Sequence, residues 1–118
     1  MHCLIIEDEY LIALDIEDCL RTLGYTSFLQ AATAKSAIQA HRAKAPDLIT
    51  ADFNLAVGTG VDAVLAIGSE PAVPVIFITG QADAVKAVMP DATIVDKPVS
   101  CESVEAAIID AMRKLAMR

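Results

Sequence analysis

Five side chains able to bind a cation and a phosphoryl group follow short apolar runs in this sequence. They are Glu7 and Asp8, then Asp52, then Thr79, and finally Lys97. The apolar runs that come before them cover residues 4–6, 48–51, 75–78 and 93–95. Runs of this length are typical of strands buried in a parallel sheet, and ligands bind just outside the carboxyl ends of such strands. We therefore expect the carboxylates, the hydroxyl and the ammonium to meet at one edge of a sheet.

The carboxylate of Asp52 is the group around which we expect the site to be built. It directly follows a buried run, where an ionised carboxylate is unfavourable unless a positive charge compensates it. A single aspartate at such a place is also typical of a turn or a helix cap, so the interpretation depends on the other strand ends. An aspartate can attack phosphorus and form an aspartyl-phosphate. Because both reactants are anionic, that reaction needs a metal bound by oxygen ligands and a lysine to stabilise the developing charge.

Strand-like and helix-like segments alternate along the whole chain. Apolar residues spaced three or four apart predict helices at residues 9–23, 33–44, 61–68 and from 100 onwards. Residues 81–89 are only weakly helical, which predicts a short fourth helix, and residues 26–29 complete the set of strands. This order predicts an α/β fold with one domain over residues 1–118, in which a doubly wound, five-stranded parallel sheet is flanked by helices.

The composition limits the classes of partner and the cellular compartment that we expect. With a formal net charge of −7, the chain is expected to bind neither nucleic acid nor an anionic membrane directly. No apolar stretch approaches the roughly 20 residues that span a bilayer, and no signal peptide is evident, so we expect a cytoplasmic protein. Cys3, Cys19 and Cys101 are odd in number and lack metal-like spacing. We expect all of them to be reduced thiols in or near the core.

The acidic pair, the aspartate, the threonine and the lysine stand at strand ends in an order that resembles the receiver domain of bacterial response regulators, the CheY-like superfamily. The resemblance covers essentially the whole chain, and it is specific because all four strand ends match together. It implies that Asp52 accepts the phosphoryl group. It also implies that Mg²⁺ is held by Glu7, Asp8 and Asp52 and by the backbone carbonyl of Asn54.

The resemblance assigns the remaining site residues and the partners as well. It implies that Thr79 and Lys97 contact the phosphoryl oxygens. The phosphoryl group would come from a sensor histidine kinase or a histidine phosphotransfer protein, in a two-component system or phosphorelay, and the domain would signal to a downstream protein through protein–protein contacts. A receiver is not an enzyme in the usual sense, because it promotes only its own phosphorylation and dephosphorylation. Since no residues follow Arg118, we expect a stand-alone receiver.

A few positions depart from the family pattern. Ile94 stands three residues before the lysine, where the family often has an aromatic residue that reorients on activation. Ala56 replaces a frequent proline, and the run Phe77–Gly80 is similar to the Phe-Ala-Thr-Gly motif of a divergent subgroup of single-domain receivers. Gly58 and Gly60 are expected to supply positive-φ or close-approach positions in the loop after the aspartate. These departures concern how a signal leaves the domain and not the phosphorylation chemistry.

Three other functions are alternatives to a signalling receiver. A small Mg²⁺-dependent phosphohydrolase with an aspartate nucleophile would use a similar threonine and lysine. Such enzymes place a second aspartate two residues after the nucleophile as a general acid, and here that position is Asn54, which cannot serve. A flavodoxin-like FMN module is disfavoured, because Glu7 and Asp8 replace a hydroxyl- and glycine-rich phosphate cradle. A receiver that only drains phosphate from another pathway is compatible with the sequence.

Four apolar side chains extend the first and last predicted helices beyond what the sheet can bury. They are Leu11 and Leu14 on the first helix, and Ile109 and Met112 on the last. The two helices are neighbours in the fold that the chain resembles. Their extra residues could therefore form one exposed patch for a helical kinase domain, because contiguous exposed patches usually mark interaction sites. Packing against each other at the edge of the core is the alternative, and the sequence leaves both open.

Overall fold

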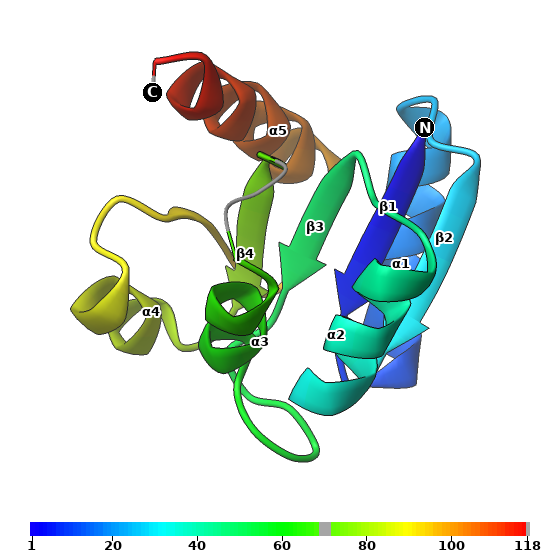
Figure 1. Ribbon diagram of the computed structural model, residues 1–118. Coiled ribbons are helices and arrows are strands. Elements are labelled where there is room, and N and C mark those ends of the chain that lie inside the picture. The colour runs from blue at the N-terminus through cyan, green and yellow to red at the C-terminus, as the bar shows by residue number, and fades with distance from the viewer. Residues whose placement is uncertain (69–71, 118) are drawn as a thin grey trace.

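One parallel sheet of five strands runs through the middle of the protein (Figure 1). The computed structural model describes residues 1–68 and 72–117, and within them the strand order is β2-β1-β3-β4-β5. The strands are β1 (His2–Ile6), β2 (Ser27–Ala31), β3 (Leu48–Ala51), β4 (Val75–Thr79) and β5 (Thr93–Asp96). The helices are α1 (Tyr10–Thr22), α2 (Ala34–Ala43), α3 (Gly60–Ile67), α4 (Ala82–Val88) and α5 (Cys101–Ala116). This is the predicted doubly wound α/β fold.

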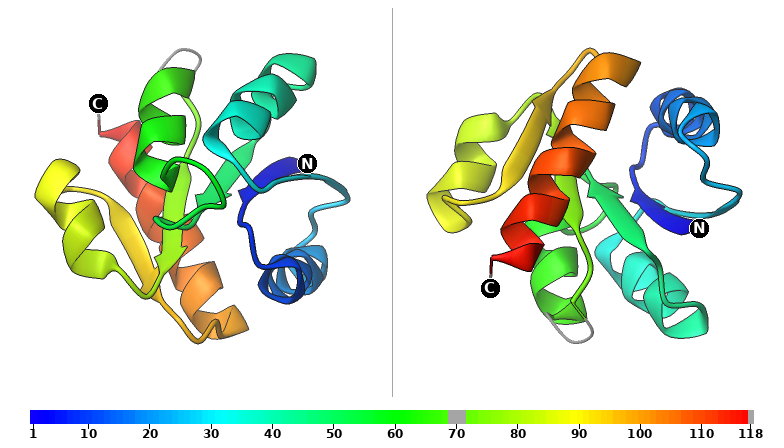
Figure 2. Two further views of the ribbon diagram at one scale, coloured as in Figure 1. Left: turned by 90° about the horizontal axis from the view of Figure 1, so that it is seen from below. Right: turned by 90° about the horizontal axis from the view of Figure 1, so that it is seen from above.

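The sheet separates two apolar layers. Side chains alternate across each strand, so Cys3 and Ile5 of β1 pack with α1 and α5, whereas Leu4 and Ile6 face the opposite layer. Helices α2, α3 and α4 cover that second face (Figure 2). Every residue of β1 and β3 is therefore buried. This explains why, apart from His2 and Thr50, these strands are apolar instead of alternating with polar residues.

Most helix boundaries agree closely with the sequence prediction, because capping residues mark them. Thr33 begins α2, and its Oγ1 accepts a hydrogen bond from the Ser36 backbone N–H at 3.0 Å. Ser100 caps α5 in the same way, with the Ser103 N–H at 3.2 Å. Helix α4 has 7 residues and is the short fourth helix that the sequence predicts. Within the two described ranges, no helix combines the length and the apolar character needed to cross a membrane.

The second strand differs most from its predicted bounds. It extends to Ala31, beyond the predicted end at residue 29, because all 5 residues of β1 pair in parallel with all 5 residues of β2. β1 likewise begins at His2, whose buried imidazole Nδ1 lies 2.8 Å from Ser27 Oγ. β2 is an edge strand with exposed residues. Strand pairing, and not hydrophobicity, therefore sets where it ends.

Two of the three cysteines form a disulfide, so the prediction of reduced thiols is wrong for Cys19 and Cys101. They are separated by 82 residues in sequence, but the end of α1 lies beside the first residue of α5 and the two Cα atoms are 5.4 Å apart. That separation is within the range that a disulfide requires. Cys3, by contrast, is a buried free thiol as predicted, and burial raises its pKa well above the usual value.

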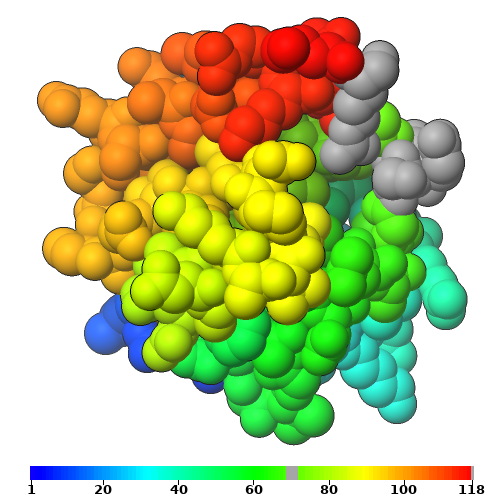
Figure 3. All heavy atoms as spheres, turned by 90° about the vertical axis from the view of Figure 1, so that its left-hand side faces the viewer, coloured from blue at the N-terminus to red at the C-terminus, as the bar shows by residue number. Residues whose placement is uncertain are grey.

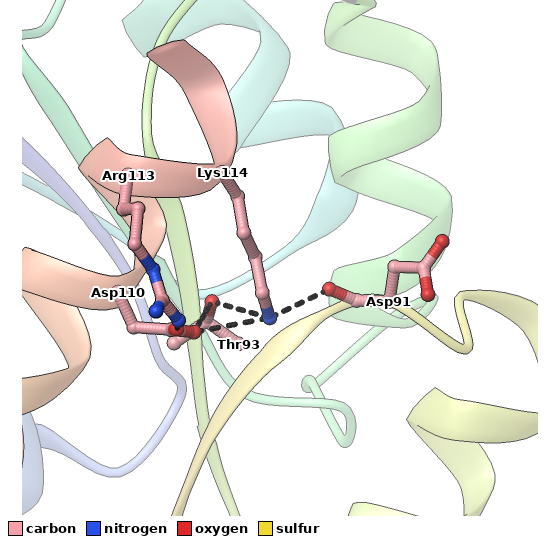
Figure 4. A network of polar contacts seen from close by, with 5 residues as sticks. All are labelled: Asp91, Thr93, Asp110, Arg113 and Lys114. Atoms are coloured by element: carbon pink, nitrogen blue, oxygen red, sulfur yellow. Dashed lines mark hydrogen bonds and ion pairs between the residues drawn. The ribbon is translucent and has the colours of Figure 1, made fainter. Parts of the chain in front are cut away.

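A polar network fastens the C-terminal half of α5 to β5 (Figure 4). The Lys114 ammonium donates hydrogen bonds to the Asp91 backbone carbonyl at 2.9 Å and to Thr93 Oγ1 at 3.1 Å, and it pairs with the Asp110 carboxylate at 3.0 Å. The Thr93 hydroxyl donates to the same carboxylate at 2.7 Å, and Arg113 forms a second ion pair with it. The hydrogen bond from Thr93 and the two cations lower the pKa of Asp110 to about 2. The carboxylate is therefore ionised at neutral pH, where the network is intact.

The apolar residues predicted to form a surface patch differ in exposure. Leu11 on α1 is 75% exposed and Ile109 on α5 is 65% exposed, and Met112 is exposed as well, whereas Leu14 is half-buried. In both views of Figure 2, α5 lies beside α1 only at its beginning and then diverges from it. The α5 residues belong to the half of the helix that leads away from α1. This arrangement favours separate apolar positions over one continuous patch.

Candidate functional site

The carboxyl ends of four neighbouring strands bring the reactive side chains of the sequence to one edge of the sheet. Glu7 and Asp8 follow β1, Asp52 follows β3, Thr79 ends β4, and Lys97 follows β5. Backbone hydrogen bonds hold these ends together, because the Asp52 N–H donates to the last carbonyl of β1 at 2.9 Å and the Lys97 N–H donates to the Thr79 carbonyl at 3.2 Å. The strand order thus places side chains from four distant segments next to one another.

The ammonium of Lys97 bridges two buried carboxylates. Its Nζ lies 2.7 Å from Asp52 Oδ2 and 2.8 Å from Glu7 Oε1. Burial acts to lower the pKa of Lys97, but the hydrogen bonds to Asp52 and Glu7 outweigh burial and the pKa is raised overall. Lys97 is therefore the charge that compensates Asp52. The bridge to Glu7 was missed in the sequence, because no local signal connects a glutamate near the N-terminus with a lysine after the last strand.

The three carboxylates form a group that fits a hard cation. One oxygen from each of Glu7, Asp8 and Asp52 lies within 4.8 Å of the others. Glu7 and Asp52 are buried, whereas Asp8 is exposed and open to solvent. Among the described residues, the Lys97 ammonium at 2.8 Å is the one polar partner of Glu7 Oε1. An all-oxygen donor set of this kind is what Mg²⁺ prefers in proteins.

Asn54 and Thr79 lie beside this group in different ways. Asn54 is exposed and forms an isolated bridge with Thr59, in the loop that leaves Asp52. Thr79 is fully buried at the end of β4, and its Oγ1 accepts a hydrogen bond from the Gln81 N–H at 3.0 Å. Because that bond uses an acceptor position of the hydroxyl, the hydroxyl proton is free to be donated to a ligand.

The carboxyl of Glu7 has a strongly shifted pKa. Burial raises it from 4.5 to about 7, the hydrogen bond with Lys97 opposes this change, and the charge of Asp52 adds to it. The proton of Glu7 is thus bound and released near neutral pH when no metal is present. Burial and the like charge of Asp52 together outweigh the effect of the Lys97 ammonium on this carboxyl.

Without Mg²⁺, we expect Glu7 to make the free energy of unfolding fall as the pH rises from about 5 to about 8. Its pKa is about 7 in the folded state against a reference value of 4.5, so between these values the folded protein holds a proton that the unfolded chain has released. The stabilisation is complete below the reference value and is lost as the pH passes the folded value. Urea unfolding at several pH values should show this loss in the parent protein and not in Glu7→Gln. Identical pH profiles for the two proteins would contradict it.

The backbone that carries Asp52 packs directly against the first residue of α3. A Cβ atom added to Gly60 would overlap the carbonyl group of Asp52, and the Gly60 N–H donates a hydrogen bond to the Phe53 carbonyl at 2.9 Å. Gly58 has a φ of 82°, which favours glycine. The two expected roles of the loop glycines, close approach and positive φ, are therefore divided between Gly60 and Gly58.

Gly60→Ala is expected to lower the free energy of unfolding by about 1–3 kcal/mol, because the new methyl group must push the Asp52 backbone away. Urea unfolding measures this change. Gly80→Ala is a matched control: a Cβ added at Gly80 meets nothing within 4 Å, so its stability should stay within about 0.5 kcal/mol of the parent. Equal stability of the two variants would show that the loop accommodates a side chain at residue 60.

A cavity of about 820 Å³ lies at the opposite edge of the sheet from the carboxylates. It is lined by the end of α3, the connection from α4 to β5 and the last turns of α5, with apolar side chains such as Phe77, Met89 and Leu115. Figure 3 looks onto this face, with α5 above the α4–β5 connection. Its lining residues Thr93 and Lys114 are already hydrogen-bonded in the network that holds α5. None of the reactive side chains at the carboxyl edge lines this cavity, so the two sites are separate.

Comparison with known proteins identifies relatives of the chain. A sequence model described as the response regulator receiver domain matches residues 3–109. The phyllosphere-induced regulator PhyR of Methylorubrum extorquens is 47% identical over 78 residues, which is 64% of this chain and 29% of that protein. The transcriptional regulatory protein PdtaR of Mycobacterium tuberculosis is 33% identical over 76 residues, which is 64% of this chain and 37% of that protein. The matched part is less than half of each of these two proteins.

Solved structures of PhyR proteins resemble this chain over nearly its whole length. A mutant of the anti-anti-sigma factor PhyR from Bartonella quintana superposes with a TM-score of 0.85 at 38% identity, covering 99% of this chain and 50% of that one. The receiver domain of PhyR from Erythrobacter litoralis superposes with a TM-score of 0.85 at 36% identity, covering 95% of this chain and 89% of that one. The similarity thus extends over all the elements that position the acidic group.

Proposed function

Because this chain belongs to the response regulator receiver domain family, we propose that it takes a phosphoryl group from a phosphohistidine onto Asp52. The donor is a sensor histidine kinase or a histidine phosphotransfer protein, and the protein works in the cytoplasm. One observation carries this proposal: the Lys97 ammonium lies 2.7 Å from a buried aspartate within a group of three carboxylates. This arrangement combines a nucleophile, a cation site and a fixed positive charge.

In the proposed reaction, a carboxylate oxygen of Asp52 bonds to phosphorus while the bond from phosphorus to the histidine nitrogen breaks. The histidine nitrogen leaves with the bonding electron pair. Lys97 is close enough to move from Asp52 Oδ2 onto a phosphoryl oxygen, where it stabilises charge in a loose transition state. The free hydroxyl proton of Thr79 supplies another hydrogen bond. Glu7, Asp8 and Asp52 would hold Mg²⁺, which supplies charge neutralisation when bound, and we also assign the Asn54 carbonyl to it.

The aspartyl-phosphate would act through protein contacts and not through turnover of a substrate. Asn54, two residues after the nucleophile, offers no general acid for a leaving group. The relatives support an output of this kind: PhyR of Bartonella quintana is described as an anti-anti-sigma factor, and PdtaR as a transcriptional regulatory protein. The proposed role of this chain is therefore that of a signalling receiver in a two-component system or phosphorelay.

The proposal is tested with acetyl phosphate and Mg²⁺, followed by intact mass spectrometry and phosphate release. A receiver gains one phosphoryl group per chain, on Asp52 by peptide mapping, and the adduct decays slowly. A phosphohydrolase releases phosphate continuously without accumulating an adduct. Neither labelling nor release in the presence of Mg²⁺ would remove the proposal. Transfer from a set of purified phosphorylated kinases would then identify the donor.

Mg²⁺ affinity should depend on Asp8 more than on Glu7. Asp8 is exposed and free to coordinate the ion directly, whereas Glu7 is engaged with Lys97. We expect millimolar or tighter binding by the parent and at least about tenfold weaker binding by Asp8→Ala. Calorimetry is suitable because the chain has no tryptophan to report binding by fluorescence. Asp15→Ala, which removes an exposed acid of α1 outside the group, is the control, and equal affinities of Asp8→Ala and parent would refute the assignment.

A further inference from the structure

The Cys19–Cys101 disulfide joins the two helices on one face of the sheet. Cys19 is in the last turns of α1 and is 8% exposed, whereas Cys101 is the first residue of α5 and is exposed. The pair is therefore asymmetric: Cys101 lies at the surface, whereas Cys19 is packed in the core. The third cysteine, Cys3, is a free thiol buried in β1 and takes no part.

Besides the buried side chains that pack α5 against the sheet, such as Val104 and Ala111, two links of different chemistry hold the helix. Its C-terminal half is fastened to β5 by the ion pairs and hydrogen bonds of Asp110, Arg113 and Lys114 (Figure 4). Its first residue is fastened to α1 by the disulfide. Both views of Figure 2 show α5 leaving α1 after its first turns, so the disulfide acts where the two helices come together. Breaking this bond removes the anchor at one end and leaves the other intact.

The expected compartment bears on whether the Cys19–Cys101 disulfide is permanent or reversible. A protein that receives phosphoryl groups from kinases in the cytoplasm, as proposed above, is exposed to reducing thiols, and disulfides found there are usually transient, catalytic or redox-sensing. This step rests on the proposed function. We propose that Cys19 and Cys101 form a reversible redox site whose oxidised form clamps the first turns of α5 to α1.

The exchange chemistry uses the exposed sulfur. A dithiol reductant attacks Cys101 through its thiolate, the bond to Cys19 breaks, and Cys19 leaves as a thiolate that takes up a proton. The second thiol of the reductant then attacks the mixed disulfide and releases Cys101 as a thiolate. The two sulfurs of the reductant end up joined in a disulfide, so two electrons have passed to the protein. In the oxidising direction, a peroxide converts the Cys101 thiolate to a sulfenic acid, and Cys19 displaces water from it to restore the bond.

Reduction should loosen the start of α5 without disturbing the acidic group. Cys101 lies four residues after Lys97, but Lys97 is held independently by its backbone bond to Thr79 and by its contacts with Asp52 and Glu7. A small phosphodonor should therefore react equally with both forms. The surface formed by α1 and the start of α5 should differ between them.

The test compares the full chain after peroxide treatment with the same chain after dithiothreitol. Alkylation followed by mass spectrometry should find Cys19 and Cys101 blocked in the first sample and both reactive in the second. Reduction should lower Tm by roughly 10 °C, since the bond closes a long loop. Hydrogen exchange should become faster at residues 104–108 and stay unchanged at residues 111–116. Cys19→Ser and Cys101→Ser should show no redox response in Tm or exchange, whereas Cys3→Ala should keep both.

Several outcomes would overturn the redox site. These are alkylation of both cysteines after peroxide, persistence of the bond in excess dithiothreitol, or equal exchange of residues 104–108 in the two forms. Acetyl phosphate labelling is measured in the same samples and should agree within twofold. Absence of labelling in both samples would count against the proposed function alone, because the alkylation and exchange results do not depend on phosphorylation. Loss of labelling in only one sample would show that the bond reaches the reactive groups, contrary to the proposal.

Discussion

Asp52→Asn is expected to reduce labelling by acetyl phosphate and Mg²⁺ to background while the protein stays folded. The substitution removes the carboxylate that we propose bonds to phosphorus, since an amide oxygen is a far poorer nucleophile than a carboxylate oxygen. Intact mass spectrometry after a fixed labelling time measures the loss. Asp62→Asn, an exposed acid on α3, is the matched control and should label like the parent. A labelled Asp52→Asn protein would mean that another residue is the acceptor.

The same variant separates the chemical role of Asp52 from a structural one. Replacing the carboxylate leaves Lys97 paired with Glu7, and it removes the like charge that helps to raise the Glu7 pKa. In metal-free buffer, Tm should therefore be unchanged or higher than that of the parent. A substantial decrease in Tm would show that the 2.7 Å contact between Asp52 and Lys97 stabilises the fold more than the repulsion within the acidic group destabilises it.

Lys97→Met should slow labelling by acetyl phosphate about 100-fold, because the ammonium is the only fixed positive charge proposed to stabilise the transferring phosphoryl group. Methionine keeps most of the aliphatic chain, so the change tests the charge and not the packing. Labelling rates at saturating Mg²⁺ measure the effect. Lys86→Met, at an exposed position on α4, should label at the parent rate. Similar rates for Lys97→Met and the parent would exclude Lys97 from the reaction.

The stability of Lys97→Met should depend on metal. Without Mg²⁺, the variant leaves two buried carboxylates uncompensated, which is expected to cost about 1–2 kcal/mol. The cost is modest because Glu7 can take up a proton near neutral pH, and because the lysine side chain is partly exposed. Mg²⁺ should restore more stability to the variant than to the parent, since it replaces the missing positive charge. Urea unfolding with and without Mg²⁺ measures both quantities, and equal responses of the two proteins to Mg²⁺ would contradict this account.

Local patterns in the sequence determined the fold class and the positions of the reactive residues. Four apolar runs were correctly predicted as buried strands of a parallel sheet, and a cap such as Thr33 marked where a helix begins. Once strands and helices alternate, the connections allow few arrangements, and all of them place strand ends at one edge. The expectation that Asp52 needs a compensating charge likewise came from its place after a buried run.

Only the tertiary structure decided which groups meet. Lys97 is 45 residues from Asp52 in sequence, and its second contact, with Glu7, joins the first and last strand segments. The close contact of Gly60 with the Asp52 backbone, the direction of α5 and the Cys19–Cys101 bond across 82 residues were equally out of reach. Apolar periodicity reports which face of an element is buried. Distances between segments remote in sequence depend instead on how whole helices pack, and that information appears only when the chain is folded.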